Sequence, residues 1–513
     1  MTIFGKMNKV TKHLRETLLA AAFMSAASVV CAQSEFMTVV ALDGTGDYTS
    51  IQDAVDACTT DGTRNFIFLR NGTHDGNIQV PKGVILSLIG ETRDGAIITH
   101  DVSHSTESDK SLTSTLYIEA YDMYCENFTT QHTAGRSGGQ AECITNSGDR
   151  LTLKNVAMKG NQDAVRFDNA SRTYMTDCYI EGTVDYIYDS GIAFIDNCEI
   201  KQLYPGYIIA PGDSYVGLSR SQVKELCGQN KLWYLGITIR DSRLVRDADN
   251  VEDGASYLGR PWGDTTSAGM YIRCYMDDHI NEEGFDDMSD TKTYIGEYQS
   301  MDLDGNLVDI SNRISWEFTE DPDHNSQYID SLVVNNIYDM DFVFTKAGED
   351  GARAGGSFDP IPLVTSPDAP TMTGNDNGAF TWEAVDSVAG YLIYKDGEYL
   401  ANTSATEYTV DGYDASATYT IRSVSATGCL SDEVDMITTG IATVRAQDVN
   451  LMITQSGIFW SGTQTATLFA LNGSTAAQKT GTYMNWSNMP AGCYILRLVD
   501  SKGNCVNKKV IKK

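Results

Sequence analysis

The chain has 513 residues, of which 42% are hydrophobic and 21% charged, a globular composition with room for two to four domains. Its 45 glycines and 27 tyrosines against 10 prolines favour β-structure with many turns. The formal net charge of −31 excludes nucleic acid as a natural partner, because phosphate binding needs basic faces. It also disfavours tight binding of a fully ionised acidic polymer, unless the binding groove is locally neutral or basic.

The first 32 residues are expected to form an export signal. Basic residues from Lys6 to Arg15 precede an apolar run over 18–30, which is too short for a stable membrane anchor, and we expect cleavage after Ala32. Cys31 leaves a lipoprotein alternative open. No other segment has the pattern of a membrane span, so we expect a protein that is secreted or held at the cell surface.

Residues 38–345 predict many short strands, because apolar alternation is repeatedly broken by Asn, Asp and Gly. One helix is expected over 50–58. A degenerate repeat places Asn or Asp before an apolar residue in stretches that begin at Leu153, Met175 and Ile195, 22 and 20 residues apart, with a further copy at Ile239. A strand-rich, leucine-poor repeat of this length fits a parallel β-helix better than a leucine-rich horseshoe.

Two short acidic motifs, Asn161-Gln162-Asp163 and Thr183-Val184-Asp185, have the same spacing of 22 residues. In a β-helix, residues one coil apart become neighbours at about 4.8 Å, so Asp163 and Asp185 should be close enough to perturb each other's protonation. Such a pair can divide the labour between a nucleophile and a proton donor. The alternative is structural, because stacked Asp and Asn residues also cap the turns of repeat folds.

The chain beyond residue 345 predicts two further small β-domains. Residues 346–367, rich in glycine and charge, are expected to be a flexible linker. In 368–439, Trp382, the alternating 391–394 and the hairpin turn Asp396-Gly397 resemble fibronectin type III domains, which implies a β-sandwich.

The last domain, 441–513, combines Leu468 to Gly473, Met489 to Leu496 and a lysine-rich end. That order resembles C-terminal sorting domains of the type IX secretion pathway, which implies contact with secretion machinery. Another small β-sandwich is the alternative.

Four other residues are candidates for the chemistry of the 38–345 region. Gln140 and Gln162 offer neutral amide donors, which suit an oxyanion without competing for a carboxylate proton. Arg260, between Gly259 and Pro261, offers a guanidinium that holds one carboxylate ionised, and Trp262 offers a surface for a sugar ring. Taken singly, each also fits an ordinary surface or turn residue.

Together these pieces resemble the pectin methylesterase family. The matching stretches occur in family order: Gly44 to Val55, Thr133 to Ala141, Gly160 to Asp163, Gly182 to Tyr188 and Leu258 to Trp262. The resemblance implies an all-β fold, a right-handed parallel β-helix followed by the two small β-domains.

The family resemblance also implies an activity, the removal of methyl esters from galacturonate units of pectin with release of methanol. Asp185 is then the nucleophile and Asp163 the general acid and later the base. Gln140 and Gln162 form the oxyanion site, Arg260 orients Asp185 and keeps it charged, and Trp262 lines a sugar subsite. No metal and no cofactor is needed.

The sequence departs from the family pattern after the second motif. Asp189-Ser190-Gly191 adds a negative charge where the family favours glycine, and Ile209-Ala210-Pro211-Gly212 replaces a polar stretch. These changes leave the core chemistry intact and affect which pectin is preferred.

Cys178 and Cys198 occupy the same position in successive repeats, as cysteines do in some family members, so we expect a disulfide between them. A ladder of buried free thiols is the alternative.

Other functions remain open at this stage. A β-helix enzyme acting on another ester or polysaccharide keeps the fold, and a non-catalytic carbohydrate-binding adhesin would use the groove only for display. A third possibility comes from Gly135-Arg136-Ser137-Gly138-Gly139, which fits the serine-hydrolase motif but needs a strand before it and a helix after it.

Overall fold

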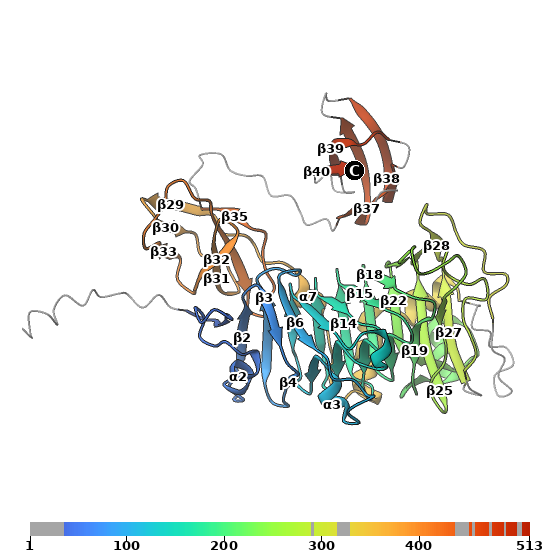
Figure 1. Cartoon of the computed structure of the whole chain (residues 1–513). Coiled ribbons are helices and arrows are strands. Elements are labelled where there is room, and N and C mark those ends of the chain that lie inside the picture. Colours follow the sequence, from blue (N-terminus) through green and yellow to red (C-terminus); the bar gives the residue numbers. More distant parts are fainter. Residues whose placement is uncertain are drawn as a thin grey trace, which may run out of the picture. The chain divides into compact units, whose positions relative to one another are not determined.

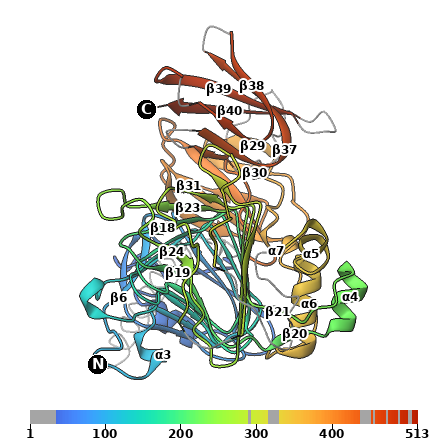
Figure 2. The ribbon, with the colours of Figure 1, turned by 90° about the vertical axis from the view of Figure 1, so that its right-hand side faces the viewer.

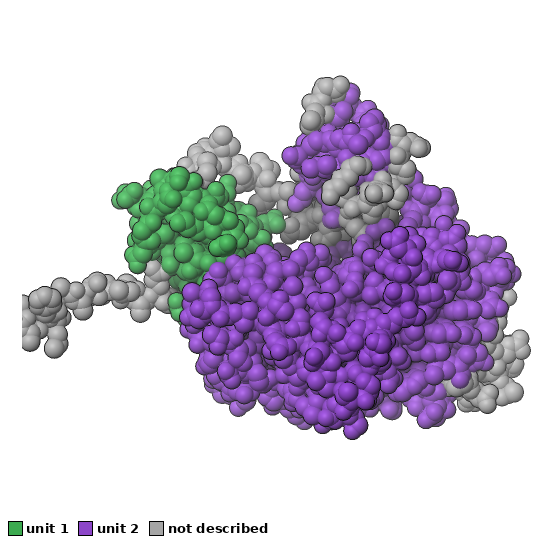
Figure 3. Space-filling model, in the orientation of Figure 1, with its two compact units in different colours: residues 1–36, 367–425, 430–438 green, residues 37–366, 426–429, 439–513 purple. Residues whose placement is uncertain are grey.

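In the computed structural model, the described residues are 35–288, 292–314, 329–436, 451–453, 457–470, 474–486, 489–499 and 505–512. The expected export signal, 1–32, lies outside them. Contacts divide the chain into two compact units, coloured separately in Figure 3: residues 1–36, 367–425 and 430–438 form one, and residues 37–366, 426–429 and 439–513 the other. None of the described helices is long and apolar enough to cross a membrane.

Three sheets of parallel strands form a β-helix within residues 37–302, as the repeat predicted (Figure 1). The ten-stranded sheet contains, in spatial order, β1 (Thr38–Val40), β2 (Arg64–Leu69), β5 (Ile85–Gly90), β8 (Tyr124–Glu126), β11 (Leu151–Lys154), β14 (Arg172–Thr176), β17 (Ile192–Asp196), β22 (Ile237–Arg240), β25 (Thr266–Ile272) and β27 (Lys292–Tyr298). The nine-stranded sheet contains β28 (Met301–Asp302), β26 (Tyr275–Met276), β23 (Arg243–Arg246), β18 (Glu199–Gln202), β15 (Tyr179–Gly182), β12 (Ala157–Lys159), β9 (Thr129–His132), β6 (Ala96–His100) and β3 (Gly72–Asp75).

The seven-stranded sheet is the one that positions the candidate site. It contains β24 (Tyr257–Gly259), β19 (Tyr207–Pro211), β16 (Ile187–Asp189), β13 (Val165–Phe167), β10 (Ile144–Asn146), β7 (Leu116–Ile118) and β4 (Ile78–Val80). A small antiparallel pair, β20 (Val216–Leu218) and β21 (Trp233–Leu235), lies outside the three sheets.

The register confirms the repeat read from the sequence. Leu153 pairs with Met175, Met175 with Ile195 and Ile195 with Ile239, so the same position recurs in four successive coils. All four side chains are fully buried inside the β-helix. The apolar residue of each repeat therefore fills the interior, and the burial of this continuous column drives the coils to stack.

Short helices accompany the sheets. They are α2 (Ile51–Asp56), where a helix was expected, α3 (Lys110–Thr113), the 3₁₀ turn η1 (Arg136–Gly138), α4 (Arg220–Cys227), α5 (Ser331–Asn336), α6 (Met340–Asp350) and α7 (Ile361–Val364). Helices α4, α5 and α6 gather on the outer face of the ten-stranded sheet, where Phe344 packs edge-on against Phe194 (Figure 2).

The segment expected to be a flexible linker differs from that prediction. It begins inside α6, and the guanidinium of Arg172, fully buried in the β-helix, donates hydrogen bonds to the carbonyls of Phe344, Gly355 and Gly356. Composition could not predict this, because the acceptors are backbone carbonyls, which every residue carries, and their partner Arg172 lies more than 170 residues away.

The two remaining regions are antiparallel. Residues 372–435 form a three-stranded sheet of β29 (Met372–Asp376), β30 (Ala379–Trp382) and β33 (Glu407–Thr409), and a four-stranded sheet of β32 (Glu398–Thr403), β31 (Val388–Lys395), β34 (Tyr419–Ser425) and β35 (Val434–Asp435). The last region contains β36 (Leu451–Ile453), β37 (Gly457–Ala470), β38 (Thr475–Asn485), β39 (Gly492–Val499) and β40 (Cys505–Lys512). These sheets fit two small β-domains.

The expected disulfide between Cys178 and Cys198 is absent from the structure, where both thiols are free and buried. The backbone N–H of Cys178 instead donates to Sγ of Cys198 at 3.4 Å, and each thiol donates to the last carbonyl of the strand before it, Thr176 of β14 and Asp196 of β17. The spacing of parallel strands, about 4.8 Å, exceeds the usual Cβ separation of a bridge, which is about 3.8 Å, so the thiol ladder is the form adopted.

Candidate active site

Three acidic side chains occupy one column along the seven-stranded sheet. Ile144 pairs with Val165, and Val165 with Ile187, so the residues two positions before each of them, Glu142, Asp163 and Asp185, lie on successive coils. The predicted adjacency of Asp163 and Asp185 is therefore confirmed. All three residues are at least 92% buried.

Tight turns carry both aspartates. Asp163 and Asp185 have φ of 62° and 53°, in the left-handed region that Asp tolerates better than most residues. Their amides donate to the next coil, Asp163 to Val184 and Asp185 to Tyr207. Gly182 at the start of the second turn leaves no room for a side chain, because a Cβ there would lie 2.3 Å from the Cβ of Tyr186.

Asp163 is the carboxyl whose protonation the fold changes most. Burial, the charge of Asp185 and the charge of Glu142 together raise the pKa of Asp163 to about 8. The Nε2 of Gln140 donates to its Oδ2 at 2.9 Å, which opposes this shift only weakly. Asp163 is therefore largely protonated at neutral pH.

Asp185 is held in a two-point ion pair. Arg260 donates from Nε to Oδ1 at 3.0 Å and from a terminal nitrogen to Oδ2 at 2.6 Å, and its guanidinium carbon lies 4.0 Å from the centre of the Tyr207 ring. Burial raises the pKa of Asp185 although Arg260 lowers it. Desolvation therefore outweighs the guanidinium in its effect on the pKa of Asp185. Asp163 is nevertheless the group whose pKa is raised to about 8, because Asp185 has a two-point ion pair with Arg260, whereas Lys110 lowers the pKa of Asp163 without forming an ion pair with it.

The other predicted residues surround this pair to different degrees. Gln140 is exposed and contacts Asp163, whereas the half-buried Gln162 forms no hydrogen bond through its amide to any residue within the described ranges. Trp262 is 44% exposed, and its ring meets Tyr188 edge-on with centroids 6.1 Å apart. The structure thus places all six predicted residues in segments that flank the strands of one sheet. Gln140 contacts Asp163 and Arg260 contacts Asp185 directly.

Glu142 and Tyr188 complete the site and were not predicted. Tyr188 donates to Glu142 at 2.7 Å, reaching across the coil that carries Asp163, and His104 and Thr113 also contact Glu142. Burial raises the pKa of Glu142, but these hydrogen bonds outweigh it and hold the pKa below its ordinary value. Glu142 therefore stays charged and adds to the repulsion that keeps Asp163 protonated. Its spacing of 21 residues before Asp163 was the available signal.

A pocket of about 370 Å³ lies on the same coils, at the carboxyl ends of β13, β16 and β19, whereas Asp163 and Asp185 precede β13 and β16. Its charged lining is acidic, with Asp168, Asp189 and Asp213 against Arg166, which is already paired with Asp168 at 2.6 Å and with Asp189 at 2.8 Å. Trp262 also lines this pocket. Asp189, whose negative charge departs from the family pattern, thus lines this pocket.

The serine-hydrolase alternative does not fit the structure. Ser137 lies in η1, a single 3₁₀ turn between β9 and β10, so the motif lacks the helix that would follow a nucleophile elbow. Within the described part of the chain, no group of three or more His, Cys, Asp or Glu side chains is arranged to hold a metal ion.

The fold and site together define a parallel β-helix protein with a protonated carboxyl beside a carboxylate held by arginine. A pectinesterase family model matches residues 37–336, and the chain belongs to this family. The matched region is the β-helix with the site described above.

Individual relatives match the same region. The chain is 29% identical over 290 residues to a probable pectinesterase/pectinesterase inhibitor from Arabidopsis thaliana, covering 54% of this chain and 52% of the relative. It is 28% identical over 288 residues to a pectinesterase from Petunia integrifolia, covering 54% and 73%. The chain thus spans about half the length of the first of these relatives. Among solved structures, pectin methylesterase from carrot matches with 26% identity and a TM-score of 0.47, over 54% of this chain and 86% of that one.

Proposed function

We propose that the protein is a pectin methylesterase, which hydrolyses the methyl esters of galacturonate units and releases methanol. The observation that carries the proposal is the unequal pair: Asp163 with its pKa raised to about 8, next to Asp185 in a two-point ion pair with Arg260. Ester hydrolysis by a carboxylate needs one ionised and one protonated carboxyl at the same pH. Family membership supports the same reaction.

In the first step, a carboxylate oxygen of Asp185 attacks the ester carbonyl carbon. Arg260 uses two acceptor sites of the carboxylate and leaves others free for attack. The carbonyl oxygen becomes an oxyanion, which collapses as the C–O bond to methanol breaks. Asp163 gives its proton to the departing methoxide, so methanol leaves and an acyl-enzyme anhydride remains.

In the second step, the now ionised Asp163 takes a proton from water, and the hydroxide attacks the anhydride. The bond to Asp185 breaks, the free acid leaves, and Asp163 is protonated again. The repulsion from Asp185 and Glu142 favours this return of the proton.

The two glutamines are proposed as the oxyanion donors. One N–H of the Gln140 amide bonds Asp163, which leaves the second N–H for the substrate. Gln162, with its amide uncommitted to any described residue, is the second donor. The exposed face of Trp262 is proposed as a wall of the sugar subsite.

The rest of the chain is proposed to deliver and anchor this domain. Residues 1–32 act as an export signal, 38–345 form the esterase domain, 368–439 a fibronectin type III-like spacer and 441–513 a sorting domain that meets secretion machinery. Export would bring the enzyme to plant cell-wall pectin, its proposed substrate and partner.

Methanol release from methyl-esterified pectin tests the proposal. We expect Asp185→Ala to lose at least about 10³-fold in kcat, because no other described carboxylate with an arginine partner faces the same position. Asp177→Ala is the matched control, since Asp177 has the same left-handed backbone (φ 58°) but lies in a different turn of the same coil. Equal methanol release by wild type and Asp185→Ala would end the assignment, as would a wild type that releases none.

A further inference from the structure

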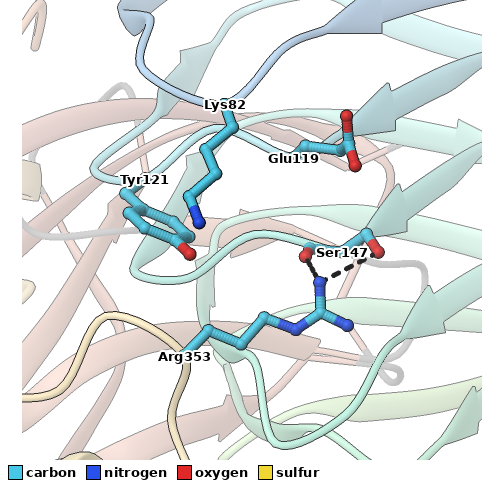
Figure 4. A pocket seen from close by; sticks show the side chains of 5 residues that line it. All are labelled: Lys82, Glu119, Tyr121, Ser147 and Arg353. Atoms are coloured by element: carbon cyan, nitrogen blue, oxygen red, sulfur yellow. Dashed lines mark hydrogen bonds between the residues drawn. The ribbon is translucent and has the colours of Figure 1, made fainter.

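A second pocket, of about 350 Å³, lies along the same seven-stranded sheet (Figure 4). Lys82, Glu119 and Ser147 line it from just beyond the carboxyl ends of β4, β7 and β10, together with Tyr121 and Arg353. The strand order β4-β7-β10-β13-β16 places this pocket up to four strands from the coil of Asp185, which is about 19 Å across the strands at the usual spacing. The full separation is larger, because Asp185 precedes β16 whereas the pocket lies beyond the carboxyl ends of its strands.

Two cations in this pocket are free to bind an anion. The ammonium of Lys82 lies 5.4 Å from the centre of the Tyr121 ring and forms no ion pair with any carboxylate among the described residues. Arg353 donates from one terminal nitrogen to the carbonyl and the hydroxyl oxygen of Ser147 (Figure 4). It forms no ion pair within the described ranges, although its charge opposes the burial that raises the pKa of Asp168 in the adjoining pocket.

The charge of this pocket contrasts with its surroundings. The chain carries a net charge of −31, and the neighbouring pocket at the next strands is acidic, with Asp168, Asp189 and Asp213. The two linings meet where Ser147 donates to Asp168 at 2.8 Å. A carboxylate on the polymer would therefore be repelled at the acidic pocket and attracted at the basic one, which supplies the local basicity that binding an acidic polymer requires.

We propose that Lys82 and Arg353 bind the free carboxylate of a de-esterified uronate unit, on the polymer chain whose methyl ester occupies the Asp163–Asp185 site. The inference rests on the proposed function and names its substrate: a pectin that already carries free acid groups a few units from the ester under attack. Tyr121 holds the Lys82 ammonium in place through its ring. Glu119, which lines the same pocket, weakens the attraction.

Binding of oligogalacturonates long enough to span both pockets tests this inference. Calorimetric titration is done with full-length protein carrying Asp185→Ala, so that no ester turns over. We expect Lys82→Gln to weaken the binding of the unesterified oligomer by about 3- to 10-fold. The affinity for the fully methyl-esterified oligomer should stay within about twofold of its original value. Glu119→Gln should increase the affinity for the unesterified oligomer by about 2- to 5-fold.

The control is Lys224→Gln, which removes the same charge from the exposed side of α4 and should change neither affinity. Raising the ionic strength should shrink the Lys82→Gln effect, since exposed charges are screened. Equal weakening of both oligomers, an equal effect of Lys224→Gln, or no measurable binding of the unesterified oligomer would overturn the inference. Because these titrations do not depend on ester cleavage, they remain distinct from the methanol assay that tests the proposed function.

Discussion

Two columns of polar residues run along this β-helix. Both use the left-handed backbone conformation, but their side chains meet different neighbours. One column lies in the turns between the ten-stranded and nine-stranded sheets and contains Asn127, Asn155, Asp177, Asn197 and Asp241. The other precedes the seven-stranded sheet and contains Glu142, Asp163 and Asp185. Every Asp and Asn in the two columns has a backbone φ between 49° and 70°. Glu142 is the one member that does not belong to this set.

The difference lies in what each side chain meets on the next coil. In the turn column, an amide donates to a side-chain oxygen on the preceding coil: Asn155 donates to Asn127 at 2.9 Å and Asn197 to Asp177 at 2.6 Å. In the acidic column, Glu142, Asp163 and Asp185 follow one another with no amide between them. Like charges on adjacent coils then repel, and burial adds to the effect, so the pKa of Asp163 rises to about 8.

The repeat itself brings equivalent residues of successive coils close together and does no more than that. A stack of Asp and Asn is held by side-chain hydrogen bonds where an amide donor meets an acceptor. Where buried acids are neighbours, the pKa of one of them rises instead. A structural role fits the turn column. The catalytic role of Asp163 and Asp185, against which a structural role is the alternative, stays a prediction.

Asp163→Asn tests the active column most directly. We expect kcat for methanol release to fall by about 10²- to 10³-fold, because an amide can neither give a proton to methoxide nor take one from water. In the wild type, activity should rise with pH as Asp185 ionises and fall as Asp163 loses its proton near pH 8.

The matched control for that substitution is Asp177→Asn in the turn column, which keeps its bond partner on the next coil and should keep full activity. A variant Asp163→Asn with an unchanged rate would show that the proton comes from elsewhere.

Arg260→Gln should have the next largest effect, about 10- to 10²-fold in kcat/KM at neutral pH. Without the guanidinium, burial alone acts on Asp185 and raises its pKa further, so the rising limb of the pH profile moves to higher pH. Arg240→Gln is a close control, because Arg240 pairs with Asp196 in the same two-point geometry, at 2.9 and 2.6 Å, in the ten-stranded sheet. A rising limb that stays in place in Arg260→Gln would contradict the assigned role.

Much of this arrangement was predictable from the sequence, because the repeat fixes the register. The spacing of 22 residues was sufficient to place Asp163 beside Asp185, and the apolar positions of each repeat were sufficient to define the interior. Glu142 has the equivalent spacing of 21 residues but falls in a stretch with no recognisable repeat, so it was missed.

Features that depend on distant segments could not be read from spacing. Arg353 reaches Ser147 from 206 residues away, and Arg172 fixes the 355–356 turn across a similar distance. The balance between burial and the Arg260 ion pair at Asp185 also depends on the packed environment, which composition does not reveal.

The stability of Asp163→Asn should change in the opposite sense to its activity. The pKa of Asp163 is about 8 in the folded protein and near 3.8 when unfolded, so between these values the folded state holds a proton that the unfolded state has released. Folding is therefore penalised progressively as pH rises from about 4 to about 8. The asparagine removes this penalty, and we expect the variant to gain about 1 to 3 kcal/mol in the free energy of unfolding at pH 8 and little at pH 4.

Thermal denaturation at the two pH values measures this gain. An increase of the same size at both would show that packing, not protonation, is responsible. No increase at pH 8 would mean that the carboxyl is already ionised there at little cost.

The turn column should respond to substitution in stability alone. Asn155→Ala removes the hydrogen bond to Asn127 and places alanine at φ 50°, so we expect a loss of about 1 to 2 kcal/mol in the free energy of unfolding and unchanged methanol release. Asn155→Gly separates the two causes, because glycine accepts this backbone freely and loses only the side-chain bonds. If the glycine variant is as unstable as the alanine variant, the amide ladder holds the coils in register. If it is as stable as wild type, the turn needs only a residue that tolerates the left-handed conformation. Asparagine then occupies these turns because of its backbone preference and not because of its side-chain hydrogen bonds.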